Sequence, residues 1–309
     1  MSRIDIAICV DQEFAMPLAV TVASIDSAAA QDDDIVVHVL HPGIDSAVRA
    51  RVSSGLTRTS IRWHAVDERA LGHSRPATFL PSASLYRMLL GEVLPAEIER
   101  VIYLDADIVV RGSLARLASV DLVGEPVGAV RDAASPWAAG PLGPDWRVLG
   151  LSPASPYFNA GMLVIDLTRW RAEGAGAACL AVLDGRHLKW GDQDALNTVF
   201  ERRWTELPRR WNLQSVDADG TGVAWGLWSE DVAAAVADPA VVHFTGRIKP
   251  WMPNGPAFSR PEWYEVLDTT AWQGWRPRVR PEKTVLTTAI GWGRTMKRSL
   301  LDRPERLPR

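Results

Sequence analysis

The sequence predicts an α/β fold in which helices flank a mostly parallel, twisted central sheet. Apolar segments of strand length alternate with helix-length segments through the first third of the chain. This alternation is typical of βαβ units. Acidic residues follow two of the apolar segments, at Asp11 and at Asp105 and Asp107. Ligands bind beyond the carboxyl ends of strands in open sheets of this kind, so we expect these acids to share one site.

Residue patterns place the elements of this first part of the chain. Expected strands cover residues 4–10, 35–40, 60–66 and 101–110, and expected helices cover residues 17–30, 44–54 and 82–90. Pro17 suits the first turn of a helix, and Ser82 or Ser84 can cap the third helix. Pro95 interrupts the helical pattern beyond residue 90.

The pattern changes after residue 133. Residues 133–156 are rich in Pro, Gly and Trp and are expected to form a long loop, either a lid or the wall of an acceptor site. Further strands are expected at residues 158–167 and 241–244, and helices at residues 168–183 and 192–200.

Composition excludes several classes of protein. The 309 residues are 47% hydrophobic, enough for a large core, and the formal net charge of −3 argues against nucleic-acid binding. Cys9 and Cys179 have no metal-ligand spacing and suit a reducing compartment. The first residues read directly into an expected strand and not into a basic-then-apolar leader, so secretion is not expected. No apolar run approaches the roughly 20 residues that cross a bilayer. We therefore expect a cytoplasmic protein.

The chain is expected to divide into a domain over residues 1–270 and a basic extension over residues 271–309. Residues 276–309 hold ten Lys and Arg against three Asp and Glu, a balance of +7. Trp292 and two leucines lie among these charges, a pattern that suits peripheral contact with an anionic membrane at its inner face. A solvated, partly disordered tail is the alternative.

The segment VIYLDADIVV at residues 101–110 carries the clearest functional signal. Asp105 and Asp107 interrupt an apolar strand, and buried carboxylates need a cationic partner. Divalent cations prefer oxygen ligands and often accompany phosphates, so this segment indicates a metal–phosphate site. An aspartate pair that caps a turn is the structural alternative.

Two further motifs place polar groups within or beside apolar segments. In YFNAGMLVIDL, Asn159 offers a donor and an acceptor, and Gly161 permits close approach of a ligand or backbone; the alternative is a β-bulge. In GDQDALN, Asp192 and Gln193 suit sugar hydroxyls, although Asp192 could simply cap a helix.

The segment HFTGRIKPW at residues 243–251 groups residues suited to a metal and a phosphate. His243 is a good ligand for an ion such as Mn²⁺, Gly246 lets backbone amides face a phosphate, and Lys249 supplies a compact positive charge. A core histidine with a surface lysine is the alternative. Several of the 14 tryptophans could stack on sugar rings or simply fill the core, namely Trp137, Trp146, Trp225, Trp228 and Trp251.

Taken in order, these motifs resemble glycosyltransferase family 8, the retaining transferases that include lipopolysaccharide galactosyl- and glucosyltransferases and glycogenin. The resemblance covers residues 4–251 and rests on YLDADIVV, YFNAGMLVIDL, GDQDALN and HFTGRIKPW. It implies a GT-A fold with a Rossmann-like nucleotide-binding half and a hexosyltransferase activity. It also implies a UDP-sugar donor, a saccharide or glycolipid acceptor, and Mn²⁺, with Mg²⁺ as the alternative ion.

The resemblance assigns roles by position. It implies that Asp105, Asp107 and His243 are the metal ligands. Gly246 and Lys249 match diphosphate-binding positions, Asp11 a uracil contact, and Arg87 an arginine that reaches toward the donor. The positions around the donor sugar match Asn159, Ala160, Gly161, Asp192 and Gln193, the last two being the catalytic candidates.

The chain departs from the family's pattern at one position, and the matched motifs also bear on mechanism. An Asn-Tyr pair often follows the first-strand aspartate in the family, whereas this chain has Glu13-Phe14, so nucleoside contacts are expected to differ.

The matched set contains no well-placed carboxylate nucleophile, and Gln193 is an amide. Front-side attack with retention is therefore expected in preference to a covalent glycosyl-enzyme.

Two other classes of function fit parts of the sequence. Asp105 to Val109 satisfies the D-x-D-x-[T/V] string of haloacid-dehalogenase-type phosphatases, which would make Asp105 a nucleophile with Mg²⁺. This interpretation leaves HFTGRIKPW unexplained. A non-catalytic nucleotide-sugar binder is the other alternative, although the expected donor-site ligands are present.

Overall fold

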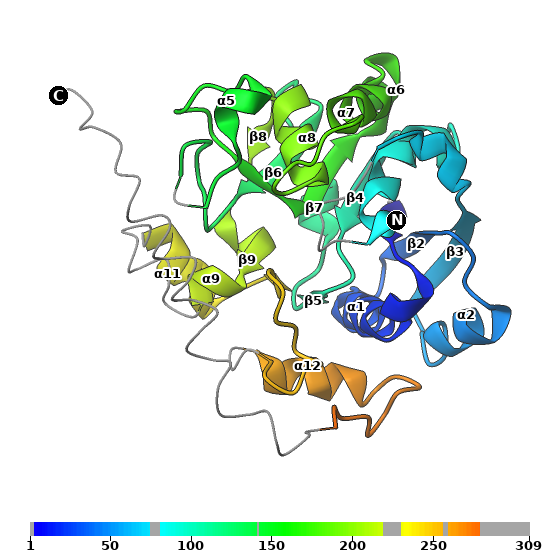
Figure 1. Ribbon diagram of the computed structural model, residues 1–309. Coiled ribbons are helices and arrows are strands. Elements are labelled where there is room, and N and C mark those ends of the chain that lie inside the picture. The colour runs from blue at the N-terminus through cyan, green and yellow to red at the C-terminus, as the bar shows by residue number, and fades with distance from the viewer. Residues whose placement is uncertain (1–2, 75–80, 141, 219–229, 256–258, 279–309) are drawn as a thin grey trace.

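The computed structural model describes residues 3–278, apart from 75–80, 141, 219–229 and 256–258. Its central feature is a seven-stranded sheet with the strand order β3-β2-β1-β4-β7-β6-β8, beside a three-stranded sheet with the order β5-β10-β9. Figure 1 shows the larger sheet between helices on both faces, as the alternating sequence pattern predicted.

The strands and helices have the following bounds. The larger sheet contains β1 (Arg3–Cys9), β2 (Asp34–His41), β3 (Thr59–Ala65), β4 (Arg100–Leu104), β6 (Val127–Arg131), β7 (Phe158–Asp166) and β8 (Thr205–Glu206). The smaller sheet contains β5 (Ile108–Val110), β9 (Leu213–Gln214) and β10 (Val241–His243). The α-helices are α1 (Ala15–Ala28), α2 (Ser46–Val52), α3 (Leu90–Val93), α4 (Ala115–Ala118), α5 (Trp146–Leu149), α6 (Leu167–Ala172), α7 (Ala175–Leu183), α8 (Asp192–Val199), α9 (Ser215–Ala218), α11 (Glu230–Ala237) and α12 (Arg260–Leu267). The 3₁₀ helices are η1 (Gln12–Phe14), η2 (Glu68–Leu71), η3 (Ser82–Leu89) and η4 (Arg209–Asn212).

The sheet is mostly parallel, as expected. Strand β1 pairs in parallel with β2 and β4, β2 with β3, and β6 with β8, whereas β7 is antiparallel to both β4 and β6. Side chains alternate between the two faces of the sheet along β1. Ile6 and Ile8 lie in a buried cluster with residues of α1, whereas Ala7 lies in a second cluster with residues of η3, α7 and α8. The two layers of helices therefore bury both faces of the sheet.

The structure corrects four sequence expectations in detail, the first three of which concern residues 101–110, 168–183 and 133–156. Residues 101–110 form two strands, β4 and β5, because the Asp105–Asp107 turn carries the chain from one sheet to the other. The helix expected at 168–183 divides into α6 and α7 at Gly174, which has a φ of +60°. The expected loop at 133–156 contains helix α5 and an isolated bridge between Trp137 and Pro156.

The helix expected at 82–90 is largely the 3₁₀ helix η3, followed by α3. The Arg87 Nε donates a hydrogen bond to the Ser84 carbonyl at 2.9 Å. That carbonyl is the one that would accept from the Met88 N–H in an α-helix, so the arginine favours the tighter turn.

The passage between the two sheets is held by helix α1. The buried Thr21 hydroxyl lies 2.8 Å from the carbonyl oxygens of both Ala106 and Ile108. One turn later, the Ser24 hydroxyl accepts a hydrogen bond from the Val110 N–H at 2.9 Å. These contacts fix the turn that carries Asp105 and Asp107 against the core.

Helix α12 and the residues after it pack beside α1 and α2. Trp263 and Leu267 of α12 are fully buried in a cluster with Val20. The Arg51 guanidinium lies over the Trp272 ring at 4.0 Å and donates to the Ala271 carbonyl at 2.9 Å. The basic tail beyond residue 278 lies outside the described residues, so its membrane contact stays a prediction. Within the described ranges, no helix combines the length and apolar character needed to span a bilayer.

Replacement of Thr21 tests how strongly helix α1 holds this turn. We expect Thr21→Val to lower the free energy of unfolding by about 1–3 kcal/mol, because the single hydroxyl hydrogen that two buried carbonyls share is lost without a change in side-chain shape. Urea denaturation measures the change. Thr21→Ser keeps the hydroxyl and should retain most of the stability; a Thr21→Val protein as stable as the wild type would contradict the assignment.

Candidate functional site

The carboxyl ends of β1 and β4 place Asp11 and the two aspartates along one edge of the sheet. Ala7 of β1 is in register with Tyr103 of β4, and each strand ends two residues or fewer beyond that pair. The Asp105 N–H donates to the Gly161 carbonyl at 2.8 Å, which adds β7 to the same edge. The ends of three neighbouring strands therefore lie at the edge where the sequence predicted a shared site.

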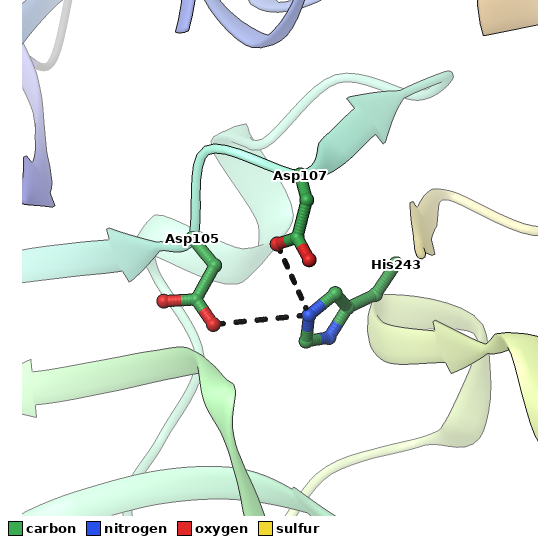
Figure 2. A group of neighbouring side chains, drawn as sticks. All are labelled: Asp105, Asp107 and His243. Atoms are coloured by element: carbon green, nitrogen blue, oxygen red, sulfur yellow. Dashed lines mark ion pairs between the residues drawn. The ribbon is translucent and has the colours of Figure 1, made fainter. Parts of the chain in front are cut away.

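Asp105, Asp107 and His243 converge on one point, as Figure 2 shows. The His243 Nε2 lies 3.4 Å from the Asp107 Oδ1 and 3.7 Å from the Asp105 Oδ2. One ligand atom from each residue falls within 4.8 Å of the other two. Two carboxylates and an imidazole nitrogen suit a divalent ion such as Mn²⁺, so the donor set fits the metal that the sequence implied.

Gly161 is what allows the histidine to approach the sheet. A Cβ added to this residue would lie 2.0 Å from the His243 Cε1 and 2.9 Å from the Asp105 Oδ2. Such distances are far below van der Waals contact, so any side chain here would displace the imidazole or the carboxylate. The sequence predicted a close approach to this glycine, and the groups that approach it are the His243 ring and the Asp105 carboxylate.

Lys249 reaches the same point from the loop after β10. Its ammonium pairs with the Asp107 Oδ2 and donates to the Phe244 carbonyl at 2.8 Å. Burial raises the pKa of Asp107, but Lys249 and His243 outweigh it and hold that pKa well below its ordinary value. Asp107 is thus a carboxylate over the whole working range of pH. Gly246, with a φ of +83°, forms the turn between His243 and Lys249.

A buried arginine links Asp105 to Asp192. The Arg87 Nη2 lies 2.8 Å from the Asp105 Oδ1, and its Nε lies 3.2 Å from the Asp192 Oδ2. The Arg87 Nη1 donates to the Ala160 carbonyl at 2.6 Å, and the Tyr103 hydroxyl donates to the Asp105 Oδ1 at 2.7 Å. Burial raises the pKa of Asp192 to about 6, although Arg87 opposes this shift.

Gln193 lies beside the NAG segment of β7. Its Oε1 accepts from the Ala160 N–H at 3.1 Å and from the Asn159 Nδ2 at 3.2 Å. Its Nε2 donates to the Asp132 Oδ2 at 3.2 Å. The structure therefore brings Asn159, Ala160 and Gln193 together, next to Asp192 at the start of α8.

Asp11, two residues beyond the end of β1, has a structural role of its own. Its Oδ1 accepts from the N–H groups of Glu13 and Phe14 at 3.0 and 3.2 Å, which caps η1. The Phe14 ring meets the Trp251 ring edge-on at 5.9 Å. Phe14, at the position where the chain departs from the family's pattern, therefore joins the loop after β1 to the HFTGRIKPW segment.

The tryptophans named from the sequence have different surroundings. Trp251 packs against Phe14 and Trp263, and Trp146 packs against a small buried cluster, as core fillers do. Trp137, in the predicted acceptor wall, is 41% exposed. Trp225 and Trp228 lie outside the described residues.

Sequence reasoning missed three buried polar residues of the site: Tyr103, Asp132 and Asn212. Asp132 follows β6, a strand that the sequence analysis did not identify, and its position after an apolar segment was the available signal. Asn212 lies at the end of η4, and no local pattern around it marks a functional residue.

The fold and this arrangement define an α/β protein with a candidate divalent-metal site at the edge of its larger sheet. Residues 5–255 match the family described as "Glycosyl transferase family 8". The chain belongs to glycosyltransferase family 8. That membership excludes the phosphatase alternative raised by the D-x-D-x-V string.

Individual relatives are similar over most of their length. The chain is 26% identical to General stress protein A of Bacillus subtilis, over 85% of this chain and 93% of that protein. It is 25% identical to a lipopolysaccharide 1,2-glucosyltransferase of Escherichia coli, over 78% of this chain and 71% of that one. The crystal structure of galactosyltransferase LgtC with donor and acceptor sugar analogs superposes with a TM-score of 0.73 at 26% identity, covering 90% of this chain and 98% of that chain. The GT-A fold is thereby confirmed.

Substitution of Gly161 tests the close packing at the centre of the site. We expect Gly161→Ala to lower the free energy of unfolding by about 1–3 kcal/mol, because the new methyl group overlaps the His243 ring. The matched control is Gly112→Ala, whose methyl group would meet only Ala240 at 3.5 Å or beyond. Chemical denaturation compares the two, and equal stability of the two variants would contradict the packing described.

The raised pKa of Asp192 predicts a pH dependence of stability. The folded protein holds this proton up to about pH 6, whereas the unfolded carboxyl releases it near 3.8. Ionisation in this window favours the unfolded chain, so the free energy of unfolding should fall by about 3 kcal/mol as pH rises through it. Asp192→Asn should remove that component, as measured by denaturation from pH 4 to pH 7; an unchanged pH profile would refute it.

Proposed function

We propose that the protein is a metal-dependent retaining hexosyltransferase that moves glucose or galactose from a UDP-sugar to a saccharide or glycolipid acceptor. The observation that carries this proposal is the convergence of Asp105, Asp107 and His243 with the Lys249 ammonium. Carboxylates, an imidazole and a compact cation at one point suit a divalent metal that binds a diphosphate.

The proposed metal ligands are Asp105, Asp107 and His243. An imidazole among the ligands favours Mn²⁺ over Mg²⁺, which prefers carboxylates and water. When bound, the ion would neutralise negative charge on the diphosphate as UDP departs. Lys249 would bind the same diphosphate through its ammonium, and the Gly246 turn would leave room for backbone amides to face it.

The donor sugar is proposed to lie between β7 and the start of α8. Arg87 holds Asp105 and Asp192 in fixed positions there, and Asp192 is available to accept hydrogen bonds from sugar hydroxyls. The surrounding residues proposed for this part of the site are Arg87, Asn159, Ala160, Gly161, Asp192 and Gln193. Asp11 is proposed to contact the uracil from the end of β1.

The contacts of α8 support front-side attack over a covalent glycosyl-enzyme. The Asp192 carboxylate pairs with Arg87, and the Gln193 Oε1 accepts from Ala160 and Asn159. Asp194 is held by the Tyr157 hydroxyl at 2.5 Å and the Trp190 N–H at 2.8 Å. The Gln193 carbonyl and the Asp194 carboxylate are thus engaged by protein donors, and Arg87 offsets the charge of Asp192, which makes it a weaker nucleophile. The acceptor hydroxyl would approach on the side from which UDP leaves and pass its proton to the departing phosphate.

The similarity to sugar transferases supports the choice of sugar and acceptor. One relative is named as a lipopolysaccharide glucosyltransferase, and the structure with a TM-score of 0.73 is a galactosyltransferase. The half-exposed Trp137, in the segment predicted as an acceptor wall, offers an apolar ring on which an acceptor sugar could stack.

Removal of one metal-ligand charge tests this function. Asp107→Asn should reduce UDP-sugar turnover by at least about a thousandfold with the fold unchanged, because an amide has the same volume but no charge for the metal. Release of UDP in the presence of Mn²⁺ measures turnover. Asp166→Asn, at the cap of α6 away from the site, makes the same chemical change and should keep full activity. Full turnover by Asp107→Asn would refute the metal site, and a wild type that binds UDP-sugars without turnover would favour the non-catalytic binder.

Replacement of Lys249 separates diphosphate binding from metal binding. Lys249→Ala should weaken UDP binding in the presence of Mn²⁺ about tenfold or more, because a charge-assisted contact with phosphate is lost. It should strengthen binding of Mn²⁺ alone, because Asp107 loses a competing cation. Calorimetry measures both. Unchanged UDP binding would contradict a diphosphate contact for Lys249 and leave only its ion pair with Asp107.

A further inference from the structure

A chain of buried side chains runs from Asp132 to the back of the His243 ring. The Asn159 Nδ2 donates to the Asp132 Oδ2 at 3.2 Å, and the Asn212 Nδ2 donates to the Asn159 Oδ1 at 3.0 Å. The Asn212 Oδ1 lies 2.9 Å from the His243 Nδ1. All four residues are at most 8% exposed, so water does not compete for these contacts.

The orientation of the Asn159 amide is fixed from both ends. Its Oδ1 accepts from the Gly161 N–H at 3.0 Å, and a backbone N–H can only donate. Its Nδ2 faces the Asp132 carboxylate, which can only accept when ionised. The Asp132 Oδ1 in turn accepts from the N–H groups of Ala134 and Ser135 at 2.9 and 2.8 Å. If the Asn159 amide were flipped, its nitrogen would face the Gly161 N–H and its oxygen would face the Asp132 carboxylate. Two donors would then meet at one end and two acceptors at the other.

The contacts of Asn159 use its whole hydrogen-bonding capacity. The two Nδ2 hydrogens go to Asp132 and to the Gln193 Oε1, and the two Oδ1 lone pairs take Gly161 and Asn212. Asn159 therefore has no donor hydrogen or acceptor lone pair available for a sugar hydroxyl. It lines the donor site as a positioning residue.

This orientation determines where His243 carries its proton. Because the Asn159 Oδ1 accepts, the group of Asn212 that faces it must be the amide nitrogen. The Asn212 oxygen then faces His243, so the Nδ1 of the ring must be the nitrogen that bears hydrogen. In the neutral ring, Nε2 is left with a free lone pair, directed at Asp105 and Asp107.

We propose that Asp132, Asn159 and Asn212 form a relay that holds His243 in the Nδ1–H tautomer and so makes Nε2 a metal ligand. The relay matters because carboxylate oxygens 3.4 and 3.7 Å from Nε2 could accept a hydrogen bond from that nitrogen if it carried the ring hydrogen. A proton there would block metal binding. This inference rests on the proposed metal-dependent function, and it assigns Asp132 and Asn212 as positioning residues.

The tautomer can be measured in the metal-free protein. Two-bond ¹H–¹⁵N spectra of the histidine-labelled protein at pH 8 report the protonated nitrogen of each of its six histidines. His243 is assigned by the signals lost in His243→Gln. We expect His243 as the Nδ1–H tautomer in the wild type; an Nε2–H tautomer would overturn the proposal without any variant.

Three variants test the role of the relay. Asn212→Leu removes the acceptor, so His243 should populate the Nε2–H tautomer and Mn²⁺ affinity, measured by electron paramagnetic resonance, should fall about 10–100-fold. Asn212→Asp loses the donor to the Asn159 Oδ1 but keeps an acceptor at the His243 Nδ1, and should keep the tautomer. Thr59→Val replaces a buried polar side chain in β3, an edge strand of the larger sheet that does not adjoin β4 or β7, and should change neither reading. A wild-type tautomer and Mn²⁺ affinity in Asn212→Leu would overturn the relay.

Failure of the relay and failure of the proposed function give different results. If Asn212→Leu does not fold, the wild-type spectrum and Asn212→Asp still decide the tautomer, and loss of the Nδ1–H signal in Asn212→Asp would count against the relay. A wild type with the expected tautomer and Mn²⁺ affinity but no UDP-sugar turnover would support the relay and contradict the transferase proposal. Turnover of a UDP-sugar by a wild type whose His243 is the Nε2–H tautomer would support the transferase proposal and contradict the relay.

Discussion

The site depends on the mutual neutralisation of buried charges at the carboxyl edge of the sheet. Asp105, Asp107 and Asp192 are drawn into one region, where an isolated carboxylate would lose several kcal/mol of hydration. Arg87 and Lys249 compensate them, each from a segment distant in the sequence. These three ion pairs tie η3 and the loop after β10 to the strand ends and to the start of α8, around the proposed metal site.

The close packing around this charge explains the unusual backbone of the region. The Asp105–Asp107 turn transfers the chain between two sheets, and the Thr21 hydroxyl of α1 contacts the Ala106 and Ile108 carbonyls at that turn. Gly161 removes the side chain that would separate His243 from β7. The metal-site geometry thus rests on buried neighbours, which favours a preformed site over one assembled by the donor.

The sequence predicted the parallel sheet, the strand ends and the metal-ligand candidates because each leaves a local pattern of apolar runs broken by polar residues. It did not predict that residues 101–110 divide between two sheets, since both halves are buried and equally apolar. Asp132 and Asn212 were missed for a different reason. Their roles arise from contacts with Asn159 and His243 that are remote in the chain, and neither residue type is unusual in its own segment.

This edge of the sheet is proposed to bind a nucleoside diphosphate through a divalent metal, and every other functional assignment depends on that binding. Calorimetric titration of the whole chain with UDP, in Mn²⁺ and then in EDTA, tests it most directly. We expect binding in Mn²⁺ that is lost or at least about a hundredfold weaker in EDTA, because two carboxylates would otherwise repel the diphosphate. Equal binding under both conditions, or no binding in Mn²⁺, would contradict the proposed site.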